Sequence, residues 1–433
     1  MRIAIYTLGC KVNQYETQAL ETELLRRGHA LVGFEETADA YVVNTCTVTA
    51  VSDKKSRAMI RRAQKLSPSA VVAVCGCYAQ TDPQAVAALG VDLVMGTSDR
   101  MAFLDEVEAL VGAHSVRPQF PEVHVDDIMK HRNFEILPAG GMEGRTRAML
   151  KVEDGCVNFC TYCIIPYARG PVRSLPLGDA VAEAKRLAEA GYREIVLTGI
   201  EISSWAQDFR DGTSLIDLVE ALCAAVSDLR VRLGSLEPRT ITEDFCGRAA
   251  LLPNLCPHFH LSMQSGCDSV LKRMNRKYDT ARYYESVELL RKHFTDPAIT
   301  TDLIVGFPSE TGEEFSETLA FVEKCAFSSM HIFPYSRRAG TPADKMEGQA
   351  PNAVKEERAH RAGELAARLE REYLTRRVGE TIPVLFEEQK NDLWRGHAPS
   401  YVAVYAEGKD LHNVLRNVKI TDIHADGLLG ELL

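Results

Sequence analysis

The stretch Asp154-Gly155-Cys156-Val157-Asn158-Phe159-Cys160-Thr161-Tyr162-Cys163 places three cysteines in a C-x3-C-x2-C spacing. This spacing differs from the paired C-x2-C of zinc ribbons. Three thiolates on a four-iron cluster leave one iron free for another ligand, whereas a fourth thiolate would close the site. A structural zinc site with its fourth ligand elsewhere is the alternative, because thiolates bind zinc as readily as iron–sulfur clusters. The spacing favours an iron–sulfur centre.

With Tyr162 directly before the last cysteine, the stretch resembles the radical S-adenosylmethionine (SAM) superfamily. The resemblance implies that Cys156, Cys160 and Cys163 hold a 4Fe-4S cluster and that SAM chelates the fourth iron. Reduction of that cluster would generate a 5′-deoxyadenosyl radical. These three cysteines are therefore the expected catalytic and metal-binding residues, and Tyr162 is expected to lie at the cofactor.

Composition and length limit the class of protein. A chain of 433 residues predicts two or three domains, and 45% hydrophobic with 25% charged residues is typical of a soluble globular protein. We find no apolar run of membrane-spanning length and no signal-peptide pattern after Met1, so we expect a cytoplasmic protein without membrane contact. The net charge of −10 argues against indiscriminate nucleic-acid binding but permits a local basic face.

Twelve cysteines in a reducing compartment are better explained by metal binding of a subset than by disulfides. Five of them stand singly in helix-like or loop contexts, and we expect these to pack as small hydrophobic residues: Cys223, Cys246, Cys256, Cys267 and Cys325.

Strands and helices alternate through the first part of the chain, which predicts a mostly parallel sheet covered by helices on both faces. The expected strands are residues 3–8, 40–44, 71–74 and 93–95, and the expected helices are residues 13–27, 53–66 and 83–89. We expect this open α/β domain to span residues 1–117.

Three more cysteines, Cys10, Cys46 and Cys77, each lie just beyond a predicted strand. The carboxyl ends of parallel strands share one edge of a sheet, so these cysteines are expected to converge as metal ligands. Three chance packing cysteines could share that placement. Cys75 competes with Cys77, but side chains alternate along a strand, and we favour Cys77 because it ends the strand.

The motifs GCKVN, NTCTVT and GCYAQ, followed by GCVNFCTYCIIPYARG, resemble the methylthiotransferase family of radical SAM enzymes over essentially the whole chain. The resemblance implies that Cys10, Cys46 and Cys77 hold a second 4Fe-4S cluster. It also implies an N-terminal cluster domain, a radical SAM domain and a C-terminal RNA-binding TRAM domain.

After an aperiodic linker over residues 118–145, strand–helix alternation resumes and predicts a partial TIM-like barrel over residues 146–375. The resemblance implies six strand–helix units, a (β/α)6 barrel. Polar residues at its strand ends are expected to bind SAM: Gly199, Glu201, Ser235, Glu237 and Gln264. For any single one of these residues, a structural role in capping or forming a turn is an equally good explanation. Glu201 departs from the histidine, asparagine or aspartate that the family suggests there.

Two arginines just beyond the cluster loop, Arg169 and Arg173, suit either an anionic ligand or a salt bridge that holds the loop. Short β-like runs after residue 376 predict a small antiparallel barrel over residues 376–433, which the resemblance identifies as the TRAM domain. Trp394, His397 and Tyr401 could stack on unpaired RNA bases there, although core packing is the commoner fate of such residues.

The resemblance implies a tRNA methylthiotransferase that inserts a methylthio group at carbon 2 of N6-threonylcarbamoyladenosine next to the anticodon. Its implied cofactors are two 4Fe-4S clusters and SAM, and its implied partners are the tRNA anticodon stem-loop and an electron donor of unknown identity. Within the family, N6-isopentenyladenosine or a ribosomal-protein aspartate are alternative substrates. An alternative of another class is a non-catalytic, metal-stapled RNA-binding protein.

Overall fold

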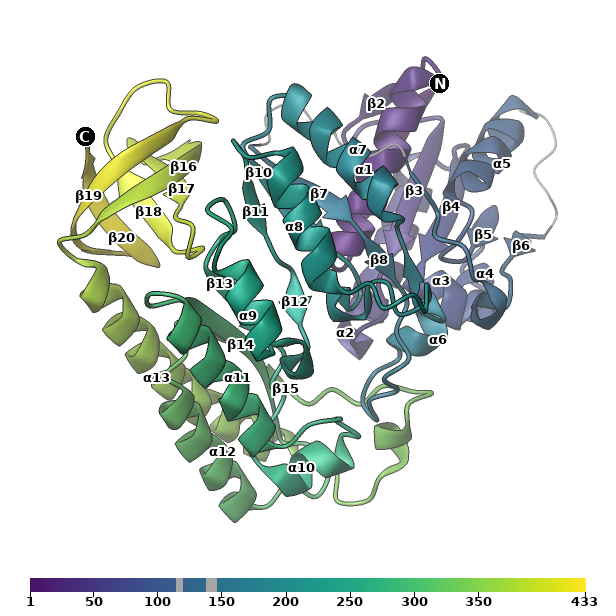
Figure 1. The fold of residues 1–433 in the computed structure, drawn as a ribbon. Coiled ribbons are helices and arrows are strands. Elements are labelled where there is room, and N and C mark those ends of the chain that lie inside the picture. The colour runs from purple at the N-terminus through teal and green to yellow at the C-terminus, as the bar shows by residue number, and fades with distance from the viewer. Residues whose placement is uncertain (114–119, 138–145) are drawn as a thin grey trace.

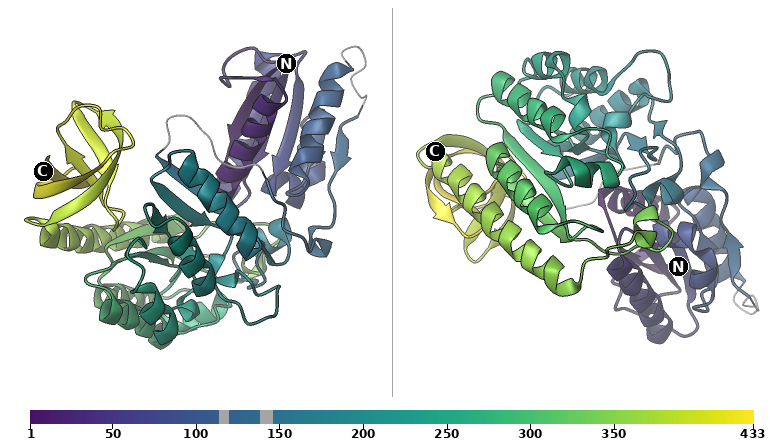
Figure 2. Two further views of the ribbon diagram at one scale, coloured as in Figure 1. Left: turned by 45° about the horizontal axis from the view of Figure 1, so that its top comes forward. Right: turned by 90° about the horizontal axis from the view of Figure 1, so that it is seen from below.

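The computed structural model describes residues 1–113, 120–137 and 146–433, which form three successive units (Figure 1). An N-terminal α/β domain and a C-terminal β-barrel flank a central α/β domain, and the views of Figure 2 show the same arrangement from two further sides. Among the described residues, no helix combines the length and apolar character needed to span a bilayer.

The N-terminal domain is built on a six-stranded sheet in the order β2-β1-β3-β4-β5-β6, and every neighbouring pair is parallel. Its strands are β1 (Arg2–Thr7), β2 (Ala30–Val32), β3 (Ala40–Thr45), β4 (Val71–Gly76), β5 (Leu93–Met95) and β6 (Glu122–His124). The predicted parallel sheet is confirmed. The short outer strands β2 and β6 were not predicted.

Helices cover both faces of this sheet, as the alternation predicts. One face packs its apolar side chains against α1 (Lys11–Arg26) and α5 (Arg100–Gly112), and the other packs against α2 (Ala50–Leu66) and α4 (Pro83–Ala87). The inner strands β3 and β4 are buried at every position because they are covered on both sides. A single helical turn, α3 (Cys77–Thr81), follows β4 directly.

Part of the expected linker belongs to the N-terminal sheet, which differs from the prediction. Strand β6 pairs with β5 in parallel, and a 3-10 turn, η1 (Ile128–Lys130), follows it. The strand was missed because it is a half-exposed edge strand of three residues with no apolar run. Residues 118, 119 and 138–145 of the expected linker lie outside the described residues.

The central domain is the predicted partial barrel of parallel strands wrapped by helices. Its strands form two sheets, β11-β10-β7 and β12-β13-β14-β15. They are β7 (Arg147–Lys151), β10 (Glu194–Thr198), β11 (Arg230–Arg232), β12 (Ser235–Leu236), β13 (His258–Leu261), β14 (Ala298–Val305) and β15 (Ser329–Pro334). The helices are α7 (Leu177–Glu189), α8 (Leu215–Ala225), α9 (Glu243–Ala249), α10 (Asp268–Arg273), α11 (Thr280–His293) and α12 (Gly312–Cys325).

Alternate residues of the central strands face opposite sides, which separates an apolar shell from a polar interior. Ile195 and Leu197 of β10 pack into the main hydrophobic core beneath the helices. Val196 between them lines a cavity on the inner side together with Arg147 and Met149 of β7. The barrel interior is therefore left free to hold a ligand.

The long helix α13 (Asn352–Arg377) leads to the C-terminal barrel of β16 (Thr381–Lys390), β17 (Leu393–His397), β18 (Ala403–Ala406), β19 (Leu415–His424) and β20 (Gly427–Leu432). The closed order is β16-β17-β18-β20-β19, and the β18–β20 pair is parallel, so the barrel is not purely antiparallel as predicted. Trp394 donates to the Gly408 carbonyl oxygen at 3.2 Å, and His397 is buried. Packing rather than base stacking accounts for these two side chains.

Candidate active site

The first three cysteines of interest lie at one edge of the N-terminal sheet. Cys10 caps α1 after β1, Cys46 follows β3, and Cys77 opens α3 after β4. Strands β1, β3 and β4 are neighbours, so these ends adjoin. Gly9 has φ +114°, and a Cβ built there would lie 2.9 Å from the Cys46 Cβ. Only glycine lets the turn before Cys10 approach Cys46 so closely.

The three thiols lie near enough to influence one another's ionisation. Burial raises the pKa of Cys77 to about 12, Cys10 and Cys46 raise it too, and Arg169 opposes the shift. Burial and Cys10 likewise raise the pKa of Cys46. Cys75, in contrast, packs into the hydrophobic core on the α1–α5 face of the sheet. The structure thus brings Cys10, Cys46 and Cys77 together and leaves Cys75 apart.

The second triplet lies on the loop after β8 (Glu153–Asp154). The Cys163 backbone N–H donates to the Cys160 carbonyl oxygen at 2.9 Å, which folds the last turn of the loop. The Arg276 guanidinium approaches the Cys160 sulfur at 3.3 Å. Burial raises the pKa of Cys163 to about 12, and Cys160 raises it further. Metal binding at either triplet requires loss of these thiol protons.

Gly155, directly before Cys156, has a backbone conformation and close contacts that only glycine tolerates. Its φ is +91°, and a Cβ there would lie 2.0 Å from the Pro171 carbonyl oxygen. Gly155→Ala should therefore lower the free energy of unfolding of the metal-free protein by about 2 kcal/mol or more, through backbone strain and collision. Urea unfolding followed by circular dichroism measures the change.

Gly178→Ala is the matched control for that substitution. Gly178 lies in α7, and a Cβ there would meet no atom within 4 Å. Alanine is the better helix former, so this variant should be as stable as the parent or more stable by up to about 1 kcal/mol. Equal stability of the two alanine variants would contradict the role given to Gly155.

A buried network of charges joins the N-terminal domain to the central domain between the two triplets. Arg169, which is fully buried, donates through Nη2 to the Asn13 Oδ1 at 2.6 Å and to the Glu16 Oε2 at 3.1 Å. Its Nε approaches the Cys77 sulfur at 3.4 Å. Arg169 therefore contacts one triplet while it ends α6 (Ile165–Arg169), the short helix that directly follows the loop with the other triplet. It lies too deep to meet a free ligand from solvent.

The network pairs buried cations with buried carboxylates. Glu16 is paired with Arg100, Lys151 and Arg169, and Asp154 with Lys151, Arg169 and Arg173. Burial opposes ionisation of Glu16, but the three cations hold its pKa well below the ordinary value. Four cations and two carboxylates form these ion pairs beside the triplets, and the buried carboxyl groups of Glu135 and Glu153 adjoin them.

Two of the predicted SAM-binding residues, Glu201 and Glu237, meet beside the second triplet. They line a cavity of about 270 Å³ with Asn158 of the cysteine loop and with Arg239. Ser204 donates to the Glu201 Oε2 at 2.8 Å, and burial together with Glu237 raises the pKa of Glu201. The cavity offers carboxylate and amide oxygens of the kind that bind an ammonium group or ribose hydroxyls.

The other residues predicted to bind SAM do not line this cavity. Gly199 packs against Glu153, with no room for a Cβ, and Tyr162 packs against an apolar cluster around Phe307. Gln264 bridges β13 and β14 through its backbone at φ +69°. Ser235 lines a separate cavity in the barrel interior.

The barrel interior holds two adjoining cavities of about 420 and 470 Å³ that were not predicted from the sequence. Both are lined by Lys11, Arg232 and Tyr401, and the larger also by His258 and His260. The sequence does contain a pattern that could have predicted these cavities. Ionisable residues stand at alternate positions of buried strands, as His258 and His260 do in β13. Those positions face the interior, where a ligand can meet them.

Comparison with protein families finds two matches along the chain. Residues 2–96 match the model described as uncharacterized protein family UPF0004, and residues 150–322 match the radical SAM superfamily. The first match contains Cys10, Cys46 and Cys77, and the second contains Cys156, Cys160 and Cys163.

Relatives match nearly the whole chain. A threonylcarbamoyladenosine tRNA methylthiotransferase of Bacillus subtilis is 41% identical over 427 residues, which cover 96% of this chain and 93% of the relative. Its Thermotoga maritima counterpart is 39% identical over 99% of this chain and 96% of its own length. A tRNA-2-methylthio-N(6)-dimethylallyladenosine synthase of Acetivibrio thermocellus is 34% identical over 99% of this chain and 90% of its own.

Among solved structures, the radical S-adenosylmethionine methyltransferase TsrM of Kitasatospora setae shares the fold with a TM-score of 0.58. The similarity covers 79% of this chain and 77% of that one at 16% sequence identity. At that identity it supports the arrangement of an α/β domain beside a partial barrel and nothing finer.

Proposed function

Because this chain belongs to the methylthiotransferase family of radical SAM enzymes, we propose that it inserts a methylthio group at carbon 2 of N6-threonylcarbamoyladenosine next to the anticodon of a tRNA. We assign the sulfur-cluster role to residues 1–117, the radical role to residues 146–375, and contact with the anticodon stem-loop to the barrel at residues 376–433.

The polar lining of the barrel interior favours N6-threonylcarbamoyladenosine over N6-isopentenyladenosine as the substrate. Lys11, Arg147, His258, His260 and Asp302 border the two adjoining cavities. A threonylcarbamoyl group carries a carboxylate and a hydroxyl, which need charged and hydrogen-bonding partners when they leave water. An isopentenyl group is apolar and would be better served by aliphatic or aromatic walls. The lining therefore favours the threonylcarbamoyl substrate.

The cysteines have distinct roles in this proposal. Cys156, Cys160 and Cys163 would hold the cluster that, with SAM, supplies radical chemistry at a C–H bond that has no acidic proton, and Cys10, Cys46 and Cys77 would hold the second cluster. Arg276 and Arg169 each place a guanidinium beside one cysteine sulfur of a triplet. These buried cations stabilise thiolates in surroundings that otherwise disfavour charge.

The small cavity beside the cysteine loop is the proposed site for the polar parts of SAM. Glu201 and Glu237 would accept hydrogen bonds from its ammonium or ribose hydroxyl groups. Ser203 and Ser204 hold the Glu201 carboxylate in place, since the Ser203 N–H donates to its Oε1 at 3.1 Å and the Ser204 hydroxyl to its Oε2. Glutamate at position 201 fills the role that the family pattern gives to another polar side chain.

Nucleoside analysis tests the proposed function. Anaerobically reconstituted protein, supplied with SAM, a chemical reductant and sulfide, should convert N6-threonylcarbamoyladenosine in tRNA into its 2-methylthio derivative, read by mass spectrometry of the digested tRNA. The same tRNA carrying unmodified adenosine is the control. If isopentenyladenosine is methylthiolated instead, the proposed substrate is wrong. An iron content of about four atoms per chain or fewer after reconstitution would contradict the two-cluster assignment, because two clusters hold about eight.

A further inference from the structure

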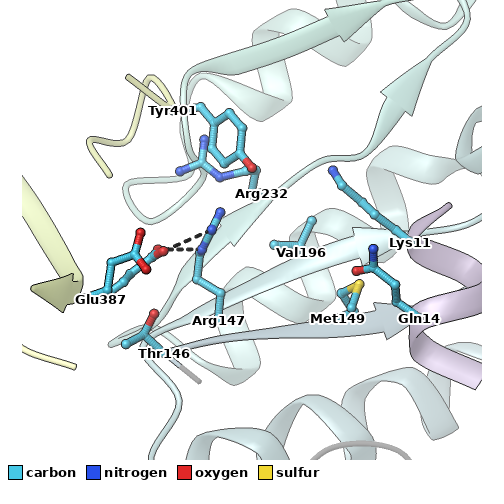
Figure 3. Close-up of a pocket in the computed structure, with 10 residues that line it drawn as sticks. Lys11, Gln14, Thr146, Arg147, Met149, Val196, Arg232, Glu387 and Tyr401 are labelled. Carbon is cyan, nitrogen blue, oxygen red and sulfur yellow. Dashed lines mark hydrogen bonds and ion pairs between the residues drawn. The ribbon is translucent and has the colours of Figure 1, made fainter. Parts of the chain in front are cut away.

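The smaller of the two interior cavities lies where all three domains meet (Figure 3). Lys11 enters it from α1 of the N-terminal domain, Arg147 and Arg232 from central strands, and Glu387 and Tyr401 from the C-terminal barrel. Figure 3 shows Lys11 extending from α1 toward the side of the cavity where Tyr401 and Arg147 lie. A ligand in this space would contact every domain at once.

Lys11 is a cation without a partner at this junction. Within residues 1–113, 120–137 and 146–433, no carboxylate lies within ion-pair distance of its ammonium group. It is also the first residue of α1, where a positive charge opposes the helix dipole. Neither a salt bridge nor helix stability therefore explains a lysine at this position.

Tyr401 presents its hydroxyl rather than its ring to the cavity. The ring stacks on His258 and His397, with centroid distances of 5.2 and 5.0 Å, and the residue as a whole remains 38% exposed. Its backbone has φ +70°, which is rare for a bulky residue and marks a conformation held by its surroundings. The C-terminal barrel thus fixes a hydroxyl group at the edge of the cavity.

Positive charge converges on that hydroxyl. Burial raises the pKa of Tyr401, but Arg147, Lys11 and Arg232 lower it by more, so it falls below the ordinary value. The guanidinium of Arg147 lies 5.3 Å from the ring centre and that of Arg232 lies 4.8 Å away. Arg232 is already paired with Glu194, and Arg147 with Glu387, which leaves Lys11 as the uncompensated charge of the group.

We propose that Lys11, Arg147 and the Tyr401 hydroxyl form a binding site for one oxyanion of the RNA substrate. This inference rests on the proposed function. It specifies which chemical group of the RNA substrate binds where the three domains meet. Two groups of the RNA have the required chemistry, the carboxylate of the threonylcarbamoyl side chain and a phosphodiester beside the target nucleotide. Both offer paired oxygens to a lysine, an arginine and a hydroxyl donor.

Binding of an anticodon stem-loop RNA to the reconstituted protein without SAM tests the site. Two RNAs serve as probes, one with N6-threonylcarbamoyladenosine and one with unmodified adenosine at the target position. Lys11→Gln and Tyr401→Phe should each weaken binding of the modified RNA by about tenfold, since a hydrogen bond to a charged group is lost. Lys185→Gln, an exposed lysine of α7 away from the cavity, should bind as the parent does.

The two RNAs identify the oxyanion. If it is the carboxylate, the loss appears with the modified RNA alone. If it is a phosphodiester, both RNAs lose affinity equally, and the slope of log Kd against log salt concentration for Lys11→Gln becomes shallower by about 0.7 to 0.9.

Affinity within twofold of the parent for both variants and both RNAs would overturn the site. Lys11→Gln removes an unfavourable charge from a helix start, so its fold should survive, and its circular dichroism spectrum checks this. Failure of the proposed function is a separate result. The parent protein would then leave the modified tRNA without a methylthio group, whatever the variants bind.

Discussion

Arg169→Met should lower the thermal unfolding midpoint of the metal-free protein by about 3 to 6 °C, equivalent to about 3 to 5 kcal/mol. Methionine keeps much of the side-chain volume but removes the donors that Arg169 gives to Glu16 and Asn13 across the domain boundary. Glu16, only 1% exposed, would keep Arg100 and Lys151 but lose its most direct link to the central domain. Circular dichroism during heating measures the midpoint.

Arg186→Met is the matched control for the loss of an arginine. Arg186 pairs with Glu183 on the surface of α7, and its side chain is 46% exposed. Surface ion pairs contribute less than about 1 kcal/mol, so this variant should unfold close to the parent. A midpoint for Arg169→Met as close to the parent as that of Arg186→Met would show that the buried network does not hold the two domains together.

The fold could be predicted from the sequence to the extent that burial imposes a regular pattern. Strands β3 and β4 are buried at every position, and the helices beside them repeat apolar residues at helical spacing, so both were predicted. Strand β6 was not predicted because it is short, polar and at the edge of its sheet. The parallel pairing of β18 with β20 was not predicted either. Strand direction in a closed barrel depends on how the strands are connected, which local residues do not encode.

Part of the candidate site could likewise be predicted from the sequence, and part of it could not. Cys10, Cys46 and Cys77 could be placed together because the ends of adjacent parallel strands must share an edge. The Arg169–Glu16 pair could not be foreseen, since it joins residues that are far apart in the chain and belong to different domains. The cavity around Lys11 and Tyr401 depends on how the C-terminal barrel docks onto the central domain, which no local pattern encodes.

Cys77→Ala should lower the iron content of the reconstituted protein by about four atoms per chain and abolish methylthiolation. Cys77 is buried, opens α3 at the shared strand edge, and its sulfur lies 3.4 Å from the Arg169 Nε. Its loss would leave Cys10 and Cys46, and two thiolates are too few to retain a four-iron cluster. The remaining cluster should still cleave SAM, so 5′-deoxyadenosine measured by chromatography should persist while the 2-methylthio product disappears.

Cys75→Ala is the matched control, because it removes the same side chain two residues earlier, inside strand β4. Cys75 is fully buried in the hydrophobic core on the α1–α5 face, where burial raises the pKa of its thiol to about 11 and favours the protonated form. Removing one sulfur from that core should cost about 1 kcal/mol and leave the iron content unchanged. The opposite result, iron lost from Cys75→Ala and retained by Cys77→Ala, would move the third ligand from the helix start onto the strand. That change would require the Cys75 side chain to leave the hydrophobic core on the α1–α5 face.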